Sequence, residues 1–390
     1  MTPYENFSFF IYLLIPLVPA VLLGMAGATG RARAAWVLLS TLGMLLFIAE
    51  PQSVLYQITA YLLFEWILIR LYLAYRTREA GENRAHVFYW MIFLSLLPLV
   101  VVKLNPSFIV LGFWHTVIGF LGISYLTFRT VGIIIEVRDG LIRDIRLLDF
   151  VSFVLFFPTL ASGPIDRYRR FITDLHKPLN RQEYGELVIQ GIDHIFRGFL
   201  YKFILAYLIN KYWLDPLSHT FGFLPTVKYM YAYSFYLFFD FAGYSAFAIG
   251  VSYILGIKTP ENFDKPFLSK NIKDFWNRWH ISLSFWFRDY IYMRFVLDSA
   301  KKKRFKNRYT ASYVGYLLLF GIMGIWHGTQ LHYIVYGLYH ALLMIGFDVL
   351  ARKNKQRKFW GKGAGWDLLA ILTTAQFVMF GFLIFSGRLG

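Results

Sequence analysis

Long apolar segments separated by short charged ones dominate this chain. Ten of them are apolar over enough residues to cross a bilayer, because a hydrocarbon core of about 30 Å needs roughly 20 residues of helix. An eleventh, from Phe150 to Ala161, is too short to cross and is predicted to dip into the membrane and return. The ten predicted spans lie near Phe9–Ala28, Ala34–Ala49, Val54–Tyr75, Val87–Val102, Phe108–Val137, Leu187–Ile209, Tyr229–Ile257, Ser312–Trp326, Tyr333–Leu350 and Trp366–Phe385.

The basic residues give these spans an orientation. With the N-terminus outside and the short segment returning to its own side, 33 of the 40 Lys and Arg residues fall in cytoplasmic stretches, as the positive-inside rule expects. A full crossing by Phe150–Ala161 would instead export the basic sequence DRYRRFITDLHKPLNR. Met1–Gly30 has no Lys or Arg and therefore lacks the basic region of a cleavable signal. We expect a multi-pass membrane protein with an extracellular N-terminus.

The stretch from Lys273 to Leu297 has a different pattern. The charges of Asp274, Arg278, Arg288, Asp289 and Arg294 would be costly within lipid, so the stretch is not a spanning helix. At helical spacing it has an aromatic face and a polar face, which predicts one amphipathic helix on the cytoplasmic side. The aromatic face comprises Trp276, Trp279, Leu283, Trp286, Tyr290 and Met293, and the polar face comprises Asn277, His280, Ser284 and Arg288.

Composition removes several classes of function. The chain is 57% hydrophobic and 20% aromatic over 390 residues, more apolar surface than a water-soluble protein could bury. It has no Cys, so disulfides, thiolate metal sites and an acyl-cysteine intermediate are excluded. Its formal charge of +17 is spread between the apolar segments, which favours anionic lipids or an acidic soluble partner over nucleic acid. No metal, nucleotide or serine-hydrolase motif is present.

Two histidines are candidates for chemistry. His327 ends the apolar run YVGYLLLFGIMGIW, and Gly324 and Gly328 beside it allow another segment or a ligand to approach closely. Near neutral pH an imidazole can take a hydroxyl proton, as ester-forming acyl transfer requires. The alternative for His327 is a helix-end histidine bonded to a carbonyl. His280 lies on the predicted polar face, where a headgroup contact and a catalytic role fit equally well.

Asp240 is the only charge between Tyr229 and Ile257. An intramembrane carboxylate suggests a functional site, but Tyr236 and Tyr244 lie one turn away on either side and could satisfy it. A structural hydrogen-bond centre is the favoured interpretation. Other predicted supporting residues are Asn277, Tyr244, Ser284 and Trp326.

The basic run from Lys301 to Arg308 follows a short apolar patch formed by Phe295, Val296 and Leu297. Such runs commonly hold a helix end at an anionic leaflet. Charge beside apolar side chains would also suit an acidic carrier protein, since charge steers the encounter and apolar contact holds it. The predicted docking residues are therefore Phe295, Val296, Leu297, Lys301, Lys302 and Arg304.

Several motifs carry a family resemblance. The sequences NFDKPFLSKNIKDFWNRWHISLSFWFRDYIY, FFDFAGYSAFAIG, SGPIDRYRRF and MGIWHG resemble the membrane-bound O-acyltransferase (MBOAT) superfamily. GISYLTFRTVGIIIEVRDG, GFLYKF and FGFLIFSG resemble its D-alanyl transfer (DltB) branch from Gram-positive bacteria. The resemblance makes His327 the signature histidine and His280 the second one. It implies one domain over residues 1–390, with spans in 1–146, a motif core in 147–350 and a last span in 351–390. Within it, about 10 or 11 helices would form a ring around a thin centre with an outer funnel.

The resemblance also implies a reaction in the bacterial cell membrane. The donor would be D-alanine, held as a thioester on the phosphopantetheine arm of a small acidic carrier protein of the DltC type. The acceptor would be lipoteichoic acid, reached directly or through a small membrane partner protein, with no permanently bound cofactor, no metal and no nucleic acid. Two alternatives stay open: O-acetylation of an exported polysaccharide such as alginate, and transport of a lipid or cell-wall precursor with Asp240 and the histidines as a proton relay.

Overall fold

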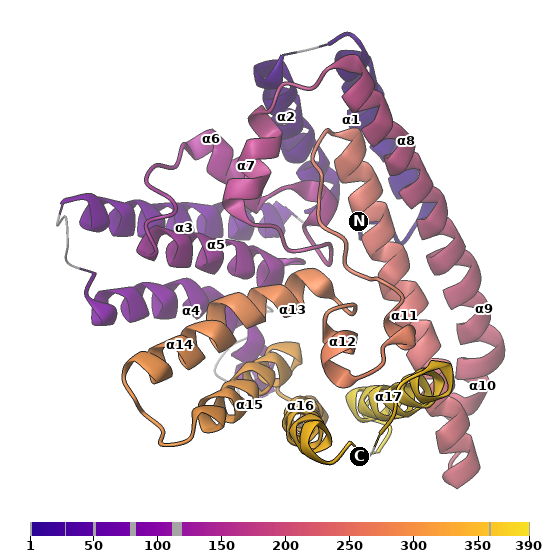
Figure 1. The fold of residues 1–390 in the computed structure, drawn as a ribbon. Coiled ribbons are helices and arrows are strands. Elements are labelled where there is room, and N and C mark those ends of the chain that lie inside the picture. The colour runs from indigo at the N-terminus through magenta and orange to yellow at the C-terminus, as the bar shows by residue number, and fades with distance from the viewer. Residues whose placement is uncertain are drawn as a thin grey trace. The chain divides into compact units, whose positions relative to one another are not determined.

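The computed structural model describes residues 2–27, 29–49, 52–78, 83–110, 119–358 and 360–389. Within these ranges the regular structure is helical, with an isolated β-bridge between Phe263 and Trp279. Eight helices there are long and apolar enough to cross a membrane, which confirms the all-α polytopic fold class. They are α1 (Phe7–Met25), α2 (Gly30–Ile48), α3 (Gln52–Arg78), α4 (Ala85–Val110), α11 (Phe223–Ile254), α15 (Arg308–His327), α16 (Leu331–Arg357) and α17 (Ala364–Phe385) (Figure 1).

The other two predicted spans do not coincide with any of these eight long helices. The prediction for Phe108–Val137 lies partly on residues 111–118, outside the described ranges, and its remainder contains the shorter helix α5 (Ile123–Arg138). The prediction for Leu187–Ile209 lies in a continuous helical run that contains two π-helical stretches. This run comprises α8 (Arg181–Gly198), a π-helical stretch Phe199–Ala206, α9 (Tyr207–Ile209), a second π-helical stretch Asn210–Leu214 and α10 (Asp215–Ser218).

The short segment near residue 150 forms α6 (Leu147–Val154), a 3₁₀ turn Phe157–Thr159 and, after a loop, α7 (Tyr168–His176). At eight residues, α6 is too short to span a bilayer. Arg129 on α5 fastens the segment by donating to the carbonyl oxygens of Phe153, Val154 and Thr159 at 2.9, 2.7 and 2.7 Å. These bonds satisfy carbonyls that would otherwise be costly to bury where the helix ends.

The predicted single amphipathic helix from Lys273 to Leu297 is wrong. The stretch forms α12 (Ile272–Trp276), α13 (Ile281–Phe287), a π-helical turn Arg288–Tyr292 and α14 (Met293–Lys301). The helical conformation is interrupted at His280, whose φ of 44° and ψ of 52° are left-handed and cannot continue a right-handed helix. Asn262 lies beside the break and its carbonyl accepts a bond from the Ile281 amide at 2.9 Å. Helical periodicity placed His280 on the polar face of one continuous helix, but the helix is interrupted at this residue, so the predicted position of its side chain does not apply.

The chain divides into two compact units. Unit 1 comprises Met1–Gly198 and Tyr244–Pro260, and in it α3, α4 and α5 pack against one another (Figure 1). Unit 2 comprises Phe199–Gly243 and Glu261–Gly390, where α15 packs along α16, α16 along α17, and α14 against α15. Unit 2 contains both candidate histidines and all predicted docking residues. The boundaries expected at residues 146 and 350, and the ring around a thin centre, stay predictions.

Candidate active site

His327 is the last residue of α15 and lies in an aromatic setting. Its ring centroid is 4.6 Å from Trp326, 4.9 Å from Phe385 on α17, and 6.1 Å from Tyr336 on α16. The flanking glycines permit this packing: a Cβ on Gly324 would lie 2.6 Å from the Tyr333 carbonyl oxygen. A Cβ on Gly328 would lie 2.5 Å from the Tyr333 ring. The close approach predicted from the glycines is therefore made by the start of α16.

His280 is the residue before α13 and is only 5% exposed. Its Nδ1 lies 3.3 Å from Oδ1 of Asn262, which is fully buried. The same Oδ1 accepts a bond from the Ser282 hydroxyl at 2.7 Å and lies 3.3 Å from the Ser282 amide nitrogen. On its other side, the His280 ring meets the Phe241 ring edge-on at 4.7 Å. Asn262 and Phe241 thus fix the position of this imidazole.

These contacts also select a tautomer. Because the Ser282 amide can only donate, the atom of Asn262 that it faces is the acceptor oxygen. His280 Nδ1 must then donate to that oxygen, which leaves Nε2 with a lone pair. Within the described part of the chain, Nε2 is buried and has no hydrogen-bond partner. His280 therefore offers one hydrogen-bond acceptor inside unit 2.

The pKa of His280 matches this neutral form. His280 lies outside the spanning helices, and its pKa is lowered to about 3, mainly by burial and to a smaller extent by the charge of His327. A neutral His280 accepts a hydrogen bond at physiological pH and does not carry a charge there.

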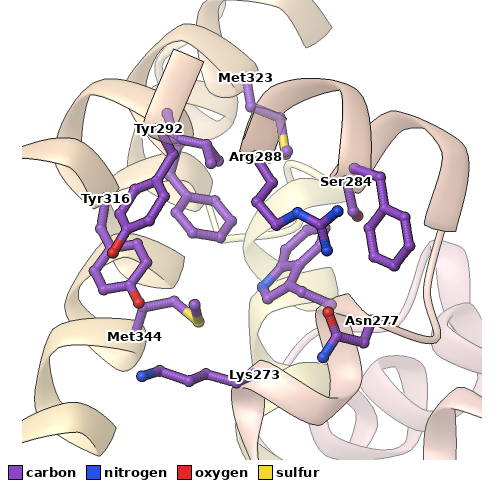
Figure 2. Close-up of a pocket in the computed structure, with 12 residues that line it drawn as sticks. Lys273, Asn277, Ser284, Arg288, Tyr292, Tyr316, Met323 and Met344 are labelled. Carbon is purple, nitrogen blue, oxygen red and sulfur yellow. The ribbon is translucent and has the colours of Figure 1, made fainter. Parts of the chain in front are cut away.

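A cavity of about 190 Å³ lies next to this region of unit 2. Asn277, Ser284 and Arg288, three of the four residues of the predicted polar face, line it together. Figure 2 shows Arg288 extending between Ser284 and Asn277, with Tyr292 and Tyr316 across the cavity and Lys273 at one end. The remaining wall is apolar and aromatic and is formed by Trp276, Phe285, Leu319, Phe320, Met323 and Met344.

Arg288 and Lys273 are the two cationic side chains that line the cavity, and each is positioned by the local structure. Arg288 begins the π-helical turn Arg288–Tyr292, and π-helical turns frequently occur at functional sites. Lys273 donates to Asp348 on α16 at 2.9 Å, which orients its ammonium group beside the cavity. Arg288 is likewise paired with a carboxylate, that of Asp289 at 2.8 Å. The cavity therefore combines two cations, each with one carboxylate partner, with an apolar wall, an arrangement that suits an extended ligand with a polar or anionic end.

Asp240 has a partner that was not foreseen from the sequence. Lys202, in the π-helical stretch Phe199–Ala206, donates to its Oδ1 at 2.6 Å. The two helices come close because Gly243 has no side chain, since a Cβ there would lie 2.7 Å from the Lys202 backbone nitrogen. Asp240 thus forms an ion pair with Lys202, a partner that the prediction from the sequence did not include. Tyr244 belongs to unit 1, where its ring packs edge-on against Tyr4 at 5.2 Å.

The predicted docking residues lie on and after α14. Leu297 is 61% exposed, and Lys301, Lys302 and Arg304 are exposed. Val296 instead faces α15, with its Cγ2 3.3 Å from where a Cβ of Gly315 would lie. Asp298 pairs with Lys302 at 3.0 Å and with Arg304 at 2.6 Å, which lowers the pKa of this carboxyl. The surface is thus basic around one exposed leucine.

Comparison with known proteins identifies the class. The family model for MBOAT, the membrane-bound O-acyltransferase family, matches residues 133–362. This range contains His280, His327 and the cavity. The chain belongs to this family and is a membrane acyltransferase.

Individual relatives are more specific. A "Teichoic acid D-alanyltransferase" of Bacillus subtilis (strain 168) is 49% identical, covering 100% of this chain and 98% of the relative. A protein of the same name from Lacticaseibacillus rhamnosus is 45% identical with the same coverage. A "Probable alginate O-acetylase AlgI" of Pseudomonas putida is 32% identical over 67% of this chain and 52% of the relative. The chain thus resembles D-alanyltransferases along its whole length and the acetylase over part of it.

Proposed function

We propose that this protein transfers D-alanine from a carrier-bound thioester to a hydroxyl of teichoic acid. The support comes from two relatives of that name, which match the chain from end to end. The observation that carries the chemistry is the buried acceptor Nε2 of His280, which lies in sequence between Asn277 and Ser284, two residues that line the cavity. A serine or cysteine nucleophile is unnecessary, because the acceptor's own hydroxyl attacks the thioester.

In the proposed reaction, His327 is the general base. Its imidazole takes the proton of the acceptor hydroxyl as the oxygen attacks the thioester carbonyl carbon. The carbon–sulfur bond then breaks, an ester forms, and the carrier's thiol leaves with a proton. A positioned base of this kind contributes about 10² to 10⁴-fold to the rate, and the remaining acceleration comes from holding both substrates in contact.

His280 has the complementary role of a positioning acceptor. Its Nε2 has a lone pair and no proton, so it can receive a hydrogen bond but cannot donate one to the thioester carbonyl. We therefore propose that it orients a donor group, either the acceptor hydroxyl or an amide N–H of the donor arm. A role as an acid that polarises the carbonyl would instead need a proton on Nε2.

The cavity is proposed as the site of the phosphopantetheine arm, which enters as part of the donor substrate. The arm has a phosphate at one end, two amides along its length and a thioester at the other end. Arg288 and Lys273 would bind the phosphate, while Asn277 and Ser284 can form hydrogen bonds with amides. The carrier itself would dock on the basic surface around Leu297, and a small membrane partner protein could relay the acyl group.

The experiment compares donors on the same purified protein in liposomes. D-alanyl-loaded carrier and an acetyl donor are supplied separately with teichoic acid, and ester formation is followed by mass spectrometry. We expect D-alanyl esters and little acetylation. Preferential acetylation would instead support the second candidate, polysaccharide O-acetylation, which the 32% identity to the alginate acetylase favours.

A further inference from the structure

Unit 1 contains a carboxyl group that the proposed reaction does not use. Glu65 lies in the middle of α3, thirteen residues from each end of this helix, and is 0% exposed. At a rise of about 1.5 Å per residue, it is roughly 20 Å from both ends of the helix. A charged carboxylate at such a depth requires a compensating partner.

The groups around Glu65 are hydroxyls. Ser95 on α4 places its Oγ 3.0 Å from Oε1 and 2.9 Å from Oε2. Ser95 in turn lies 3.3 Å from the hydroxyl of Thr130 on α5, which is 3.2 Å from that of Tyr61. A hydroxyl cluster therefore joins α3, α4 and α5 around the carboxyl, without a cation in it.

The charged groups on the neighbouring helices have other partners. Arg129 on α5 donates to carbonyls of the α6 segment, and Glu136, also on α5, pairs with Arg169 at 3.5 Å. On α6, Asp149 pairs with His176 at 2.7 Å. The other ionisable groups of these helices include Arg70, Arg76, Lys103 and Arg138. Among the residues that the structure describes, none of these forms an ion pair with Glu65, whereas Asp240 in unit 2 has Lys202.

The number of hydrogen-bond protons available between Ser95 and Glu65 indicates whether the Glu65 carboxyl is protonated. Ser95 has a single hydroxyl proton, yet its oxygen is within hydrogen-bond distance of both carboxyl oxygens. If Glu65 were ionised, these two contacts would share one proton. If Glu65 is a carboxylic acid, its O–H donates to Ser95 while the Ser95 hydroxyl donates to the second oxygen. The reciprocal pair satisfies both contacts and leaves no charge within lipid.

We propose that Glu65 is a membrane-buried proton-binding site, held as a neutral carboxylic acid by Ser95 and Thr130, and that it takes hydrophobic carbodiimides as covalent ligands. In that reaction the carboxyl proton passes to a nitrogen of the carbodiimide and the carboxyl oxygen bonds to its central carbon. The O-acylisourea formed rearranges to a stable N-acylurea, without a leaving group or a redox partner. The site fastens α3 to α4 and α5 without placing a charge in the bilayer.

The test uses the full protein in liposomes treated with dicyclohexylcarbodiimide, with peptide mass spectrometry to locate the adduct. We expect labelling at Glu65, none in Glu65→Gln, and none at Asp240, whose carboxyl group forms an ion pair with Lys202. The labelling rate should change by no more than about twofold between pH 5 and 7. A carboxyl with the ordinary pKa of about 4.3 would lose roughly a hundredfold of its acid form over that interval. Absence of the Glu65 adduct, or a loss of that size, would overturn the proposal.

A second measurement tests the neutral state of Glu65 without the reagent. Glu65→Gln keeps a neutral hydrogen-bonding group of the same shape, so its thermal unfolding should match the wild type. Glu65→Leu removes both bonds to Ser95 and should unfold at a lower temperature. Equal destabilisation by Gln and Leu would show that the negative charge is needed, and would contradict the proposal. Neither readout depends on acyl transfer, so failure here is distinguishable from failure of the proposed function.

Discussion

Asn262 and His280 form the hydrogen bond that defines the candidate site, with Oδ1 and Nδ1 3.3 Å apart. The bond crosses eighteen positions of sequence and joins the loop before α12 to the left-handed residue that starts α13. It holds the imidazole in place at the helix break and leaves Nε2 as the available acceptor. The first prediction concerns this bond.

Asn262→Leu should lower the rate of acyl transfer by about 5-fold, since one hydrogen bond of roughly 1 kcal/mol orients the imidazole. Asn262→Asp keeps the acceptor oxygen and should retain more activity than Leu. Initial rates at saturating donor measure the effect. Asn307→Ala is the control, because Asn307 caps the exposed start of α15. Full activity in Asn262→Leu would show that His280 needs no such support.

The pH dependence of folding follows from the lowered pKa of His280. The folded pKa of about 3 lies below the ordinary 6.5, so the unfolded chain takes up this proton first as the pH falls. His280 should therefore cost no stability above pH 6.5 and reduce it progressively from there toward pH 3, by up to about 1.4 kcal/mol per pH unit. Thermal unfolding at pH 7 and pH 4.5 should show a larger loss in wild type than in His280→Gln. Equal losses would contradict the neutral, buried assignment.

The Lys202–Asp240 pair predicts an asymmetric response to mutation. The Lys202 side chain is 12% exposed and that of Asp240 is 37% exposed, so solvent screens the acid more than the lysine. Asp240→Asn leaves the less exposed charge unpaired and should destabilise more than Lys202→Met, with losses of up to about 3 kcal/mol after allowing for solvent. The double variant should lose less than the sum of the two single losses. Lys211→Met, at an exposed site, is the control, and additive losses would argue against a coupled pair.

Carrier docking should depend on Leu297 more than on Val296. Leu297→Asp should weaken carrier binding by about 10-fold through lost apolar contact and repulsion of an acidic partner. Leu297→Met should bind normally. Because Val296 packs toward α15, Val296→Asp would also disturb the helix pair and is a poorer test. Binding is measured by titration with the purified carrier, and unchanged affinity in Leu297→Asp would place the docking surface elsewhere.

Replacing both Lys301 and Lys302 with Gln tests the electrostatic part of docking. The association rate should fall and become less sensitive to salt, since these exposed charges steer the encounter. Stopped-flow association at low and high ionic strength provides the measurement. An unchanged salt dependence would show that these two lysines do not take part.

The sequence predicted the features that depend on local pattern. The lengths of the apolar segments identified the eight spanning helices. The small number of apolar residues near Phe150 predicted a segment too short to span the membrane, and α6 is such a helix. The polar positions Asn277, Ser284 and Arg288 were correctly grouped, because they line one cavity even though the helix is broken between them. In each case neighbours along the chain determine the result.

The remaining features depend on contacts between distant segments. The left-handed conformation of His280 depends on bonds to Asn262, so helical periodicity could not reveal it. The start of the NFDKPF motif was the only signal for Asn262. Lys202 and Asp240 form an ion pair although thirty-eight positions separate them in the sequence, because Gly243 allows the two helices to approach closely. Asn262 and Lys202 were therefore missed, and Val296 was assigned to a surface although it faces α15.

The central claim is that His327 is the base for acyl transfer. The most direct measurement is single-turnover D-alanyl transfer by His327→Gln and His327→Ala in liposomes, with His219→Ala, an exposed histidine, as the control. We predict a loss of about 10² to 10⁴-fold for both His327 variants, with unchanged carrier binding and thermal stability. Transfer within about twofold of wild type in His327→Ala would contradict the account.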